Sequence, residues 1–204
     1  SIGTTDVIDA ESVRRRAAEL VGASKLRLSP ARLDSMESLR AILVPSLENV
    51  SFSFFEVGAR RGTVSRRYVA ETGDALSAFE TLPQLKSLEL AWSYAITDAS
   101  VAALANLAWL DEFTLESDIT DVGLARLSGL SNLRVLDLSC STGITGSGFE
   151  SWPEMPRLRA LVLSQCEKID DAALQLVTRA LELDYLVLSG CKGLSKTALS
   201  SLQG

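Results

Sequence analysis

Short strands alternating with short helices are predicted by a pattern of leucines that recurs along most of the chain. The pattern is clearest over residues 158–177. Leu161 and Leu163 stand two residues apart, which places both side chains on one face of a strand. Leu174 and Val177 stand three residues apart and form the inward stripe of a short helix. One strand and one helix are therefore expected in each unit of about 25 residues.

The turn between strand and helix carries two further signals. Cys166 falls where the chain leaves the strand, and a small buried group that forms hydrogen bonds there would satisfy backbone left unpaired. Asp170 follows at the position of a helix N-cap. Capping residues recur in register in the other units: Thr97, Thr120, Thr145 and Ser195.

The same unit can be placed over most of the chain. Its strand anchors are Leu85-Leu88-Leu90, Leu110-Phe113-Leu115, Leu133-Leu136-Leu138, Leu158-Leu161-Leu163 and Leu183-Leu186-Leu188. Their first members step by 25, 23, 25 and 25 residues. Two weaker units begin at Ala23 and Leu47. This motif and period resemble the leucine-rich repeat, which implies an α/β solenoid, a right-handed arc or horseshoe with a parallel sheet of seven strands on its concave side.

The sequence divides into a cap and a repeat region. Residues 1–22 are expected to form an N-terminal cap, with a helix in which Val13, Ala17 and Leu20 share one face. About seven repeats fill residues 23–204. We interpret Arg14 and its neighbouring arginines as a solvated helix face rather than a nucleic-acid contact, because the formal net charge of the chain is −6.

An insertion at residues 55–74 interrupts the repeats and adds about 13 residues to the period. It is locally basic through Arg60, Arg61, Arg66 and Arg67. Insertions in repeat proteins form loops on one face and often take part in binding. A contact with a partner and a merely tolerated surface loop both remain open.

The composition argues against an enzyme, a metal site or a cofactor site. The chain has no histidine, the commonest general base, and it has no C-x-x-C motif among its three cysteines. No phosphate-cradling glycine loop or activated nucleophile is found. Extracellular leucine-rich proteins usually have disulfide-bonded caps, so these few cysteines favour reduced thiols and the cytosol or nucleus.

Membrane association is not expected either, because no apolar run approaches the roughly 18 residues that a spanning helix needs. The first residue is Ser rather than Met, and we interpret the sequence as a processed or excised fragment. Residues 183–203 complete a repeat without a polar cap. We therefore expect another chain, another domain or a second copy to cover the exposed end near Leu188 and Leu199.

The predicted binding surface is the concave face, where residues between the anchors point away from the core. It combines carboxylates with large aromatics that have no core to fill: Phe54, Glu89, Trp92, Glu112, Glu116, Asp137 and Tyr185. Charge beside exposed aromatics is typical of an interaction hot spot. We expect a protein partner with a basic segment, flanked by the arginines of the insertion. A solvated face with incidental aromatics is the alternative.

Three segments carry a closer resemblance: LDLSCSTGITGSGF, LVLSQCEKIDDAAL and LVLSGCKGLSKTAL. They resemble the cysteine-containing leucine-rich repeats of F-box proteins, well over residues 83–203 and weakly over 23–82. The resemblance implies a protein-interaction scaffold, such as the substrate-recognition region of a ubiquitin-ligase component. The chain shows no recognisable F-box before the repeats. Similar repeats also occur in bacterial effectors and in a mitochondrial assembly factor, so a targeting or regulatory arm of a larger complex is the alternative.

Overall fold

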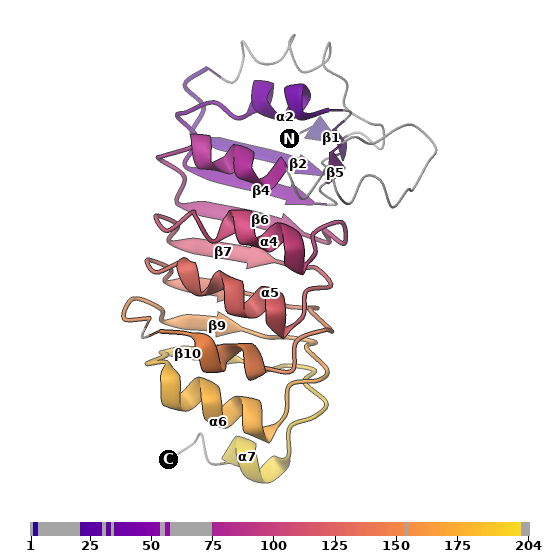
Figure 1. Ribbon diagram of the computed structural model, residues 1–204, viewed down its shortest axis with the longest axis vertical. Helices are drawn as coiled ribbons and strands as arrows, with labels where there is room; N and C mark the ends of the chain where they lie inside the picture. The colour runs from indigo at the N-terminus through magenta and orange to yellow at the C-terminus, as the bar shows by residue number, and fades with distance from the viewer. Residues whose placement is uncertain are drawn as a thin grey trace.

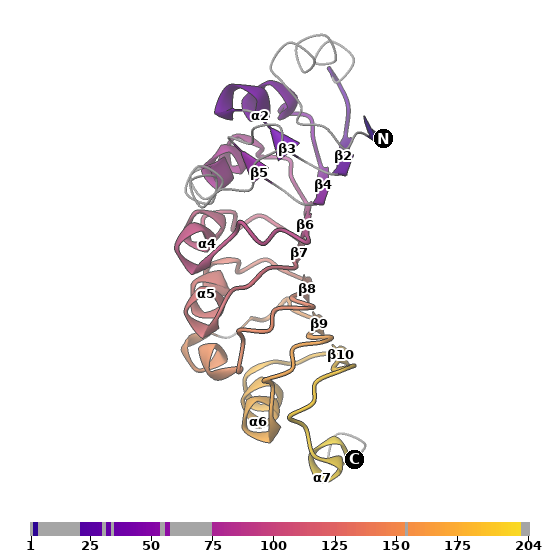
Figure 2. The ribbon, with the colours of Figure 1, turned by 90° about the vertical axis from the view of Figure 1, so that its right-hand side faces the viewer.

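The computed structural model describes residues 2–3, 21–29, 32–33, 35–53, 56–57, 75–153 and 155–200. These residues form one arc of stacked repeats. The strands lie along its concave side and the helices along its convex side, with the two ends of the chain at opposite ends of the arc (Figures 1 and 2). The solenoid expected from the leucine pattern is confirmed.

One parallel sheet runs the length of the arc, and its strands follow one another in chain order. The strands are β1 (Ile2–Gly3), β2 (Lys25–Ser29), β4 (Asn49–Ser53), β6 (Ser87–Ala91), β7 (Glu112–Leu115), β8 (Val135–Asp137), β9 (Ala160–Val162) and β10 (Tyr185–Val187). The seven predicted strands are all present and in the predicted register: Leu88, for example, pairs with Phe113, and Phe113 pairs with Leu136. An eighth strand, β1, was not predicted; it pairs in parallel with β2.

The N-terminal part contains a second, two-stranded parallel sheet of β3 (Arg32–Leu33) and β5 (Glu56–Val57). Strand β5 belongs to the insertion, which therefore begins by pairing with the preceding repeat. The rest of the insertion and the expected cap helix, apart from Val21, lie outside the described residues.

Short helices return the chain from one strand to the next on the convex side. They are α2 (Met36–Ile42), α4 (Asp98–Leu104), α5 (Asp121–Arg126), α6 (Asp171–Ala180) and α7 (Lys196–Ser200), with the 3-10 helices η1 (Leu76–Thr81), η2 (Leu127–Gly129) and η3 (Ser147–Ser151). The predicted N-caps are confirmed at Thr97, Thr120 and Asp170, and Ser195 Oγ accepts from the N–H of Ala198. Thr145 is the exception, because η3 has Gly146 as its N-cap, one residue later than predicted.

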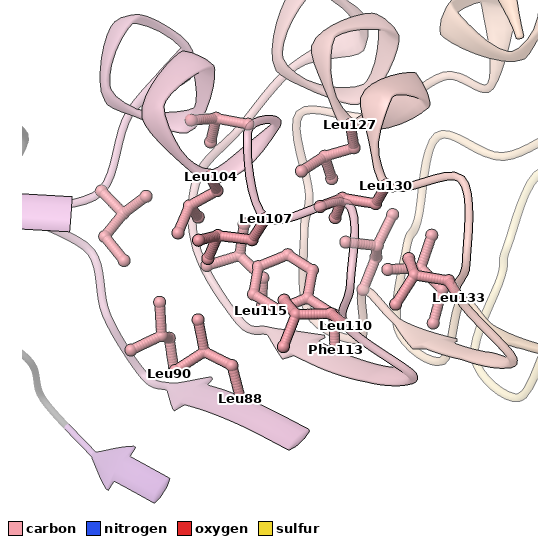
Figure 3. Packing of buried hydrophobic residues seen from close by; sticks show 14 of the residues in the cluster. Leu88, Leu90, Leu104, Leu107, Leu110, Phe113, Leu115, Leu127, Leu130 and Leu133 are labelled. Atoms are coloured by element: carbon pink, nitrogen blue, oxygen red, sulfur yellow. The ribbon is translucent and has the colours of Figure 1, made fainter. Parts of the chain in front are cut away.

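Sheet and helices enclose one continuous apolar core. Leu88 and Leu90 on β6 point into the space between sheet and helices, toward Leu104 and Leu107 (Figure 3). Leu110, Phe113 and Leu115 continue the same core into the next repeat, where Leu127 and Leu130 lie on the helix side (Figure 3). The predicted central anchors Leu136 and Leu161 are both 0% exposed. Burial of each such side chain contributes about 1.5 to 3 kcal/mol, so stacking of repeats is the main source of stability.

Two of the turns that follow strands are closed by a cysteine side chain that reaches back to the preceding repeat. The Sγ–H of Cys166 donates to the carbonyl of Leu138 at 3.2 Å, and that of Cys191 donates to Leu163 at 3.0 Å. All three cysteines are free thiols, as predicted. Cys166 is fully buried, as expected for its place in the turn, whereas Cys140 and Cys191 are half-buried. Cys140 precedes the turn position, and Cys191 lies in the last repeat.

The convex side holds an arrangement that the sequence did not reveal, which we name the aspartate ladder: Asp98, Asp121 and Asp171. Each is the first residue of a helix and accepts hydrogen bonds from the N-cap region of the next repeat. Asp98 accepts from the N–H and hydroxyl of Thr120, at 2.8 and 2.6 Å. Asp171 accepts from the N–H of Ser195 at 2.8 Å. The ladder satisfies N–H groups at helix starts that otherwise lack partners, and it joins three pairs of neighbouring repeats.

The last repeat is packed less completely than the central ones. Leu186 and Leu188 are half-buried, whereas their counterparts Leu161 and Leu163 are fully buried. Leu199 on α7 is 41% exposed. The end of the arc thus leaves apolar side chains partly open to water in the described structure.

Candidate partner-binding face

The concave face carries rows of side chains that run across the strands, in the order predicted. The middle row consists of Arg27, Ser51, Glu89, Thr114, Asp137, Val162 and Val187. A second row beside it consists of Lys25, Asn49, Ser87, Glu112, Val135, Ala160 and Tyr185. The middle row begins with Arg27, continues through the carboxylates Glu89 and Asp137, and ends with Val162 and Val187. The second row begins with Lys25 and holds one carboxylate, Glu112, before it becomes uncharged from Val135 to Tyr185.

The acidic centre of the face is formed by Glu89, Glu112, Glu116 and Asp137, a set that we name the concave acidic patch. Glu116 directly follows β7 and is half-buried. Burial raises the pKa of Glu116, and the nearby charges of Asp137 and Glu89 raise it further, although a backbone hydrogen bond from Trp92 opposes them. The hydrogen bond from Trp92 therefore does not fully offset the burial of the Glu116 carboxylate, and a cation placed beside it would favour its charged form.

Trp92 lies at the edge of this patch, directly after β6, and its side chain is 44% exposed. Its N–H donates to Glu116 Oε2 at 3.3 Å. The equivalent N–H groups of Cys140 and Gln165 instead donate to backbone carbonyls of the next repeat, at 2.8 and 2.7 Å. The repeat after Trp92 is two residues shorter than its neighbours, and there the Glu116 side chain takes the place of the carbonyl.

The backbone of Trp92 is held in the left-handed region, with a φ of 52°. The same repeat position has φ values of 64° in Cys140, 61° in Gln165 and 80° in Gly190. Left-handed backbone costs about 1 to 2 kcal/mol for a residue other than glycine. Glycine occupies this position in the last repeat, where it adopts the left-handed backbone without that cost. The local backbone conformation therefore gives no reason for a tryptophan at this position.

Tyr94 is a neighbouring aromatic that sequence reasoning missed. It lies in the same turn and is 51% exposed. Burial raises its pKa, and the charges of Asp118, Cys140 and Glu116 add to the increase, so this phenol sits beside the same acidic region. The sequence feature that could have identified Tyr94 is an aromatic residue in a predicted turn, two residues after Trp92. Turn residues follow no helix or strand period, so this residue could not be placed from the sequence alone.

The other predicted binding residues are not gathered at this site. Tyr185 lies on β10, in the same row as Glu112 but three strands along the arc. Phe54, Arg60, Arg61, Arg66 and Arg67 lie outside the described residues. The predicted site is therefore brought together at Glu89, Trp92, Glu116 and Asp137, with Glu112 beside them in the adjoining row.

Two kinds of feature are absent from the described part of the chain, clusters of metal ligands and helices able to span a membrane. No group of three or more His, Cys, Asp or Glu side chains is arranged to hold a metal ion there. Within the same ranges, none of the helices combines the length and apolar character that crossing a membrane requires.

Comparisons with known proteins agree with the architecture. A family model described as a leucine-rich repeat matches residues 129–151. A chain in the crystal structure of the Rad7 and Elc1 complex from yeast is similar in structure, with a TM-score of 0.56 and 20% sequence identity. The likeness covers 94% of this chain and 48% of that one, so this chain spans about half its length. No curated protein matches. The sequence motif, the parallel sheet and the structural likeness together show that this chain is a leucine-rich-repeat solenoid of the α/β class.

Proposed function

We infer that this chain is a protein-interaction module whose concave acidic patch, with Trp92, binds a cationic segment of a partner protein. Solenoids present extended concave surfaces suited to such binding. The observation that carries the proposal is the exposed indole of Trp92, which lies beside the carboxylate of Glu116 at the edge of the concave acidic patch. The left-handed backbone recurs in Cys140 and Gln165 and so belongs to the repeat, whereas the large exposed aromatic side chain is particular to Trp92. Tryptophan is among the commonest interface hot spots.

The chemistry of the patch specifies the partner's charge. Lysine or arginine side chains would neutralise Glu89, Glu112, Glu116 and Asp137, and could also lie over the face of the Trp92 ring as a cation–π contact. Nucleic acid is disfavoured as the occupant, since its phosphates would add negative charge to the patch.

A selection from a linear peptide library displayed on phage tests this proposal, because it does not require the partner to be identified first. The whole chain serves as bait. A Glu112→Lys/Asp137→Lys variant, shown to be folded by its thermal unfolding, serves as counter-bait. We expect the enriched peptides to be rich in Lys and Arg, to lose binding to the counter-bait, and to bind more weakly as salt is raised. A pool without excess positive charge, or one retained equally by both baits, would overturn the proposal.

A Glu150→Lys variant provides the matched control. Glu150 is also an exposed carboxylate, but it lies in η3 on the convex side. The same reversal of charge at this position should leave peptide binding unchanged.

The resemblance of the cysteine-containing repeats to those of F-box proteins extends the proposal to the substrate-recognition region of a ubiquitin-ligase component in the cytosol or nucleus. The three free thiols agree with a reducing compartment. Co-purification of the full-length gene product with a cullin adaptor tests this assignment. If the two do not associate, the ligase role is refuted while the peptide-binding role still stands.

A further inference from the structure

The two concave rows continue beyond the acidic patch into an apolar strip. On β9 and β10 the outward side chains are Ala160, Val162, Tyr185 and Val187, and none of them carries a charge. Tyr185 is 70% exposed and Val187 is 39% exposed. Among the described residues of the concave strands, Tyr185 and Val187 are the large hydrophobic residues most open to water.

The strip is in register with the patch. Tyr185 pairs with Ala160, which continues through Val135 to Glu112, and Val187 pairs with Val162, which pairs with Asp137. Neighbouring strands lie about 4.8 Å apart, so Glu112 and Tyr185 are separated by about 14 Å and Asp137 and Val187 by about 10 Å along the arc. A single ligand can therefore reach both regions.

The width of the strip indicates the form of that ligand. The two rows lie about 7 Å apart, which is the span of two residues along a strand. An α-helix with its side chains measures about 10 to 12 Å across and would overhang both rows, whereas one extended chain fits them. An extended chain advances about 3.3 Å per residue, so the two distances correspond to about three or four residues.

We propose that the partner segment is an extended peptide that carries an apolar or aromatic side chain about three or four residues from its cationic residue. This inference rests on the proposed function and adds a second anchor to it. The cation lies on the concave acidic patch, and the apolar side chain packs against Tyr185 and Val187. Lys25 and Arg27, at the other end of the same rows, repel a cation placed there, which fixes the register of the peptide along the arc.

A second copy of the chain fits the strip less well. Pairing of two copies through the outer edge of β10, the last strand of the sheet among the described residues, would use backbone hydrogen bonds in the plane of the sheet. Side chains project perpendicular to that plane, so Tyr185 and Val187 would remain exposed after edge pairing.

The test uses fluorescein-labelled synthetic peptides that contain two adjacent arginines and one leucine, joined by Ser-Gly spacers of increasing length. Fluorescence anisotropy with the whole chain gives the dissociation constants. We expect the peptide with about three or four residues between cation and leucine to bind about tenfold more tightly than shorter or longer spacers, or than a Leu→Ser version. Affinity that does not depend on the spacer would overturn the inference.

Variants of the protein separate this inference from the proposed function. A Tyr185→Ala/Val187→Ser variant should lose the tenfold advantage yet still bind the arginine peptide without leucine. A Val122→Ser variant, which changes a residue that is 56% exposed on α5, should behave as the wild type. If charge reversal at Glu112 and Asp137 abolishes binding but the Tyr185/Val187 variant binds normally, the second anchor is refuted and the proposed function stands. If neither variant changes binding, both are refuted.

Sedimentation velocity of the unliganded chain addresses the competing occupant. We expect a monomer. A dimer that dissociates on the Tyr185→Ala/Val187→Ser change would assign the strip to self-association and overturn the inference.

Discussion

The two faces of the arc use the same chemical group in opposite ways. Asp121, on the convex side, accepts hydrogen bonds from Thr145, Gly146 and Gly148, at 2.6 to 3.1 Å. Burial raises the pKa of Asp121, but these hydrogen bonds outweigh it and hold the pKa below its ordinary value. Glu116, on the concave side, accepts one long hydrogen bond from Trp92 and faces other carboxylates, and its pKa is raised.

The difference separates structural charge from charge available for binding. The carboxylate of Asp121 is already hydrogen-bonded within the fold, where it joins one repeat to the next. The charge of Glu116 is only weakly compensated and destabilises its own surroundings. A cationic partner can stabilise carboxylates such as Glu116, whose pKa is raised in the folded protein. The direction of the pKa shift therefore identifies candidate binding carboxylates better than the number of acidic residues does.

The largest effect is expected beneath both faces, where Leu136 is fully buried. Leu136→Ala should lower the free energy of unfolding by about 2 to 5 kcal/mol, through lost burial and the cavity that remains. Urea denaturation measures this loss and sets a scale for changes on either face. An unchanged unfolding midpoint would contradict the continuous core.

A smaller loss is expected on the convex side. Asp121→Ala removes the acceptor of several hydrogen bonds and should cost about 1 to 3 kcal/mol of stability, while peptide binding is retained. The pKa of Asp121 is lowered from 3.8, so its contribution is present above that value and is lost as the pH falls through the folded pKa. The stability advantage of the wild type over the variant should therefore shrink in acid. An advantage that persists at the lowest pH would argue against the aspartate ladder.

Glu116→Gln should act in the opposite sense. The pKa of Glu116 is raised above 4.5 in the folded protein. The contribution of Glu116 to folding stability is therefore fully present below pH 4.5 and is lost as the pH rises through the folded pKa. At neutral pH the amide should leave stability unchanged or slightly higher, because repulsion is removed while an oxygen can still accept from Trp92. Affinity for a cationic peptide should fall about fivefold. Denaturation and anisotropy on the same sample check both, and a clear loss of stability at neutral pH would contradict this account.

The smallest effect is expected at a turn between the two faces. Burial raises the pKa of the Cys166 thiol to about 12, so it should resist alkylation in the folded protein at neutral pH. Cys166→Ser should cost only about 1 kcal/mol and leave binding intact, because Ser93 and Ser141 occupy the same turn position in other repeats. Loss of affinity at unchanged stability would show that the turn itself contacts the partner.

The strands, their register and the buried anchors could be predicted because the period of two in a strand links leucine spacing directly to one face of a sheet. The rows of the concave face followed from the same alternation, and Trp92 is exposed as predicted. The aspartate ladder could not be predicted, since each contact joins residues more than 20 positions apart and depends on how repeats stack. The left-handed backbone of Trp92 was hidden for a related reason: it becomes evident only beside Cys140, Gln165 and Gly190 in the folded chain.

The most direct test of the central claim, that Trp92 and the concave acidic patch form the binding site, is the measurement of peptide affinity and unfolding free energy for Trp92→Gly. Gln165→Gly, at the same left-handed position and also exposed, is the matched control. Because glycine tolerates this backbone, both variants should keep their stability within about 1 kcal/mol of the wild type. Trp92→Gly alone should lose about 2 kcal/mol of affinity for a selected cationic peptide. Equal affinity for both variants, or a loss of binding only in proportion to unfolding, would contradict the account.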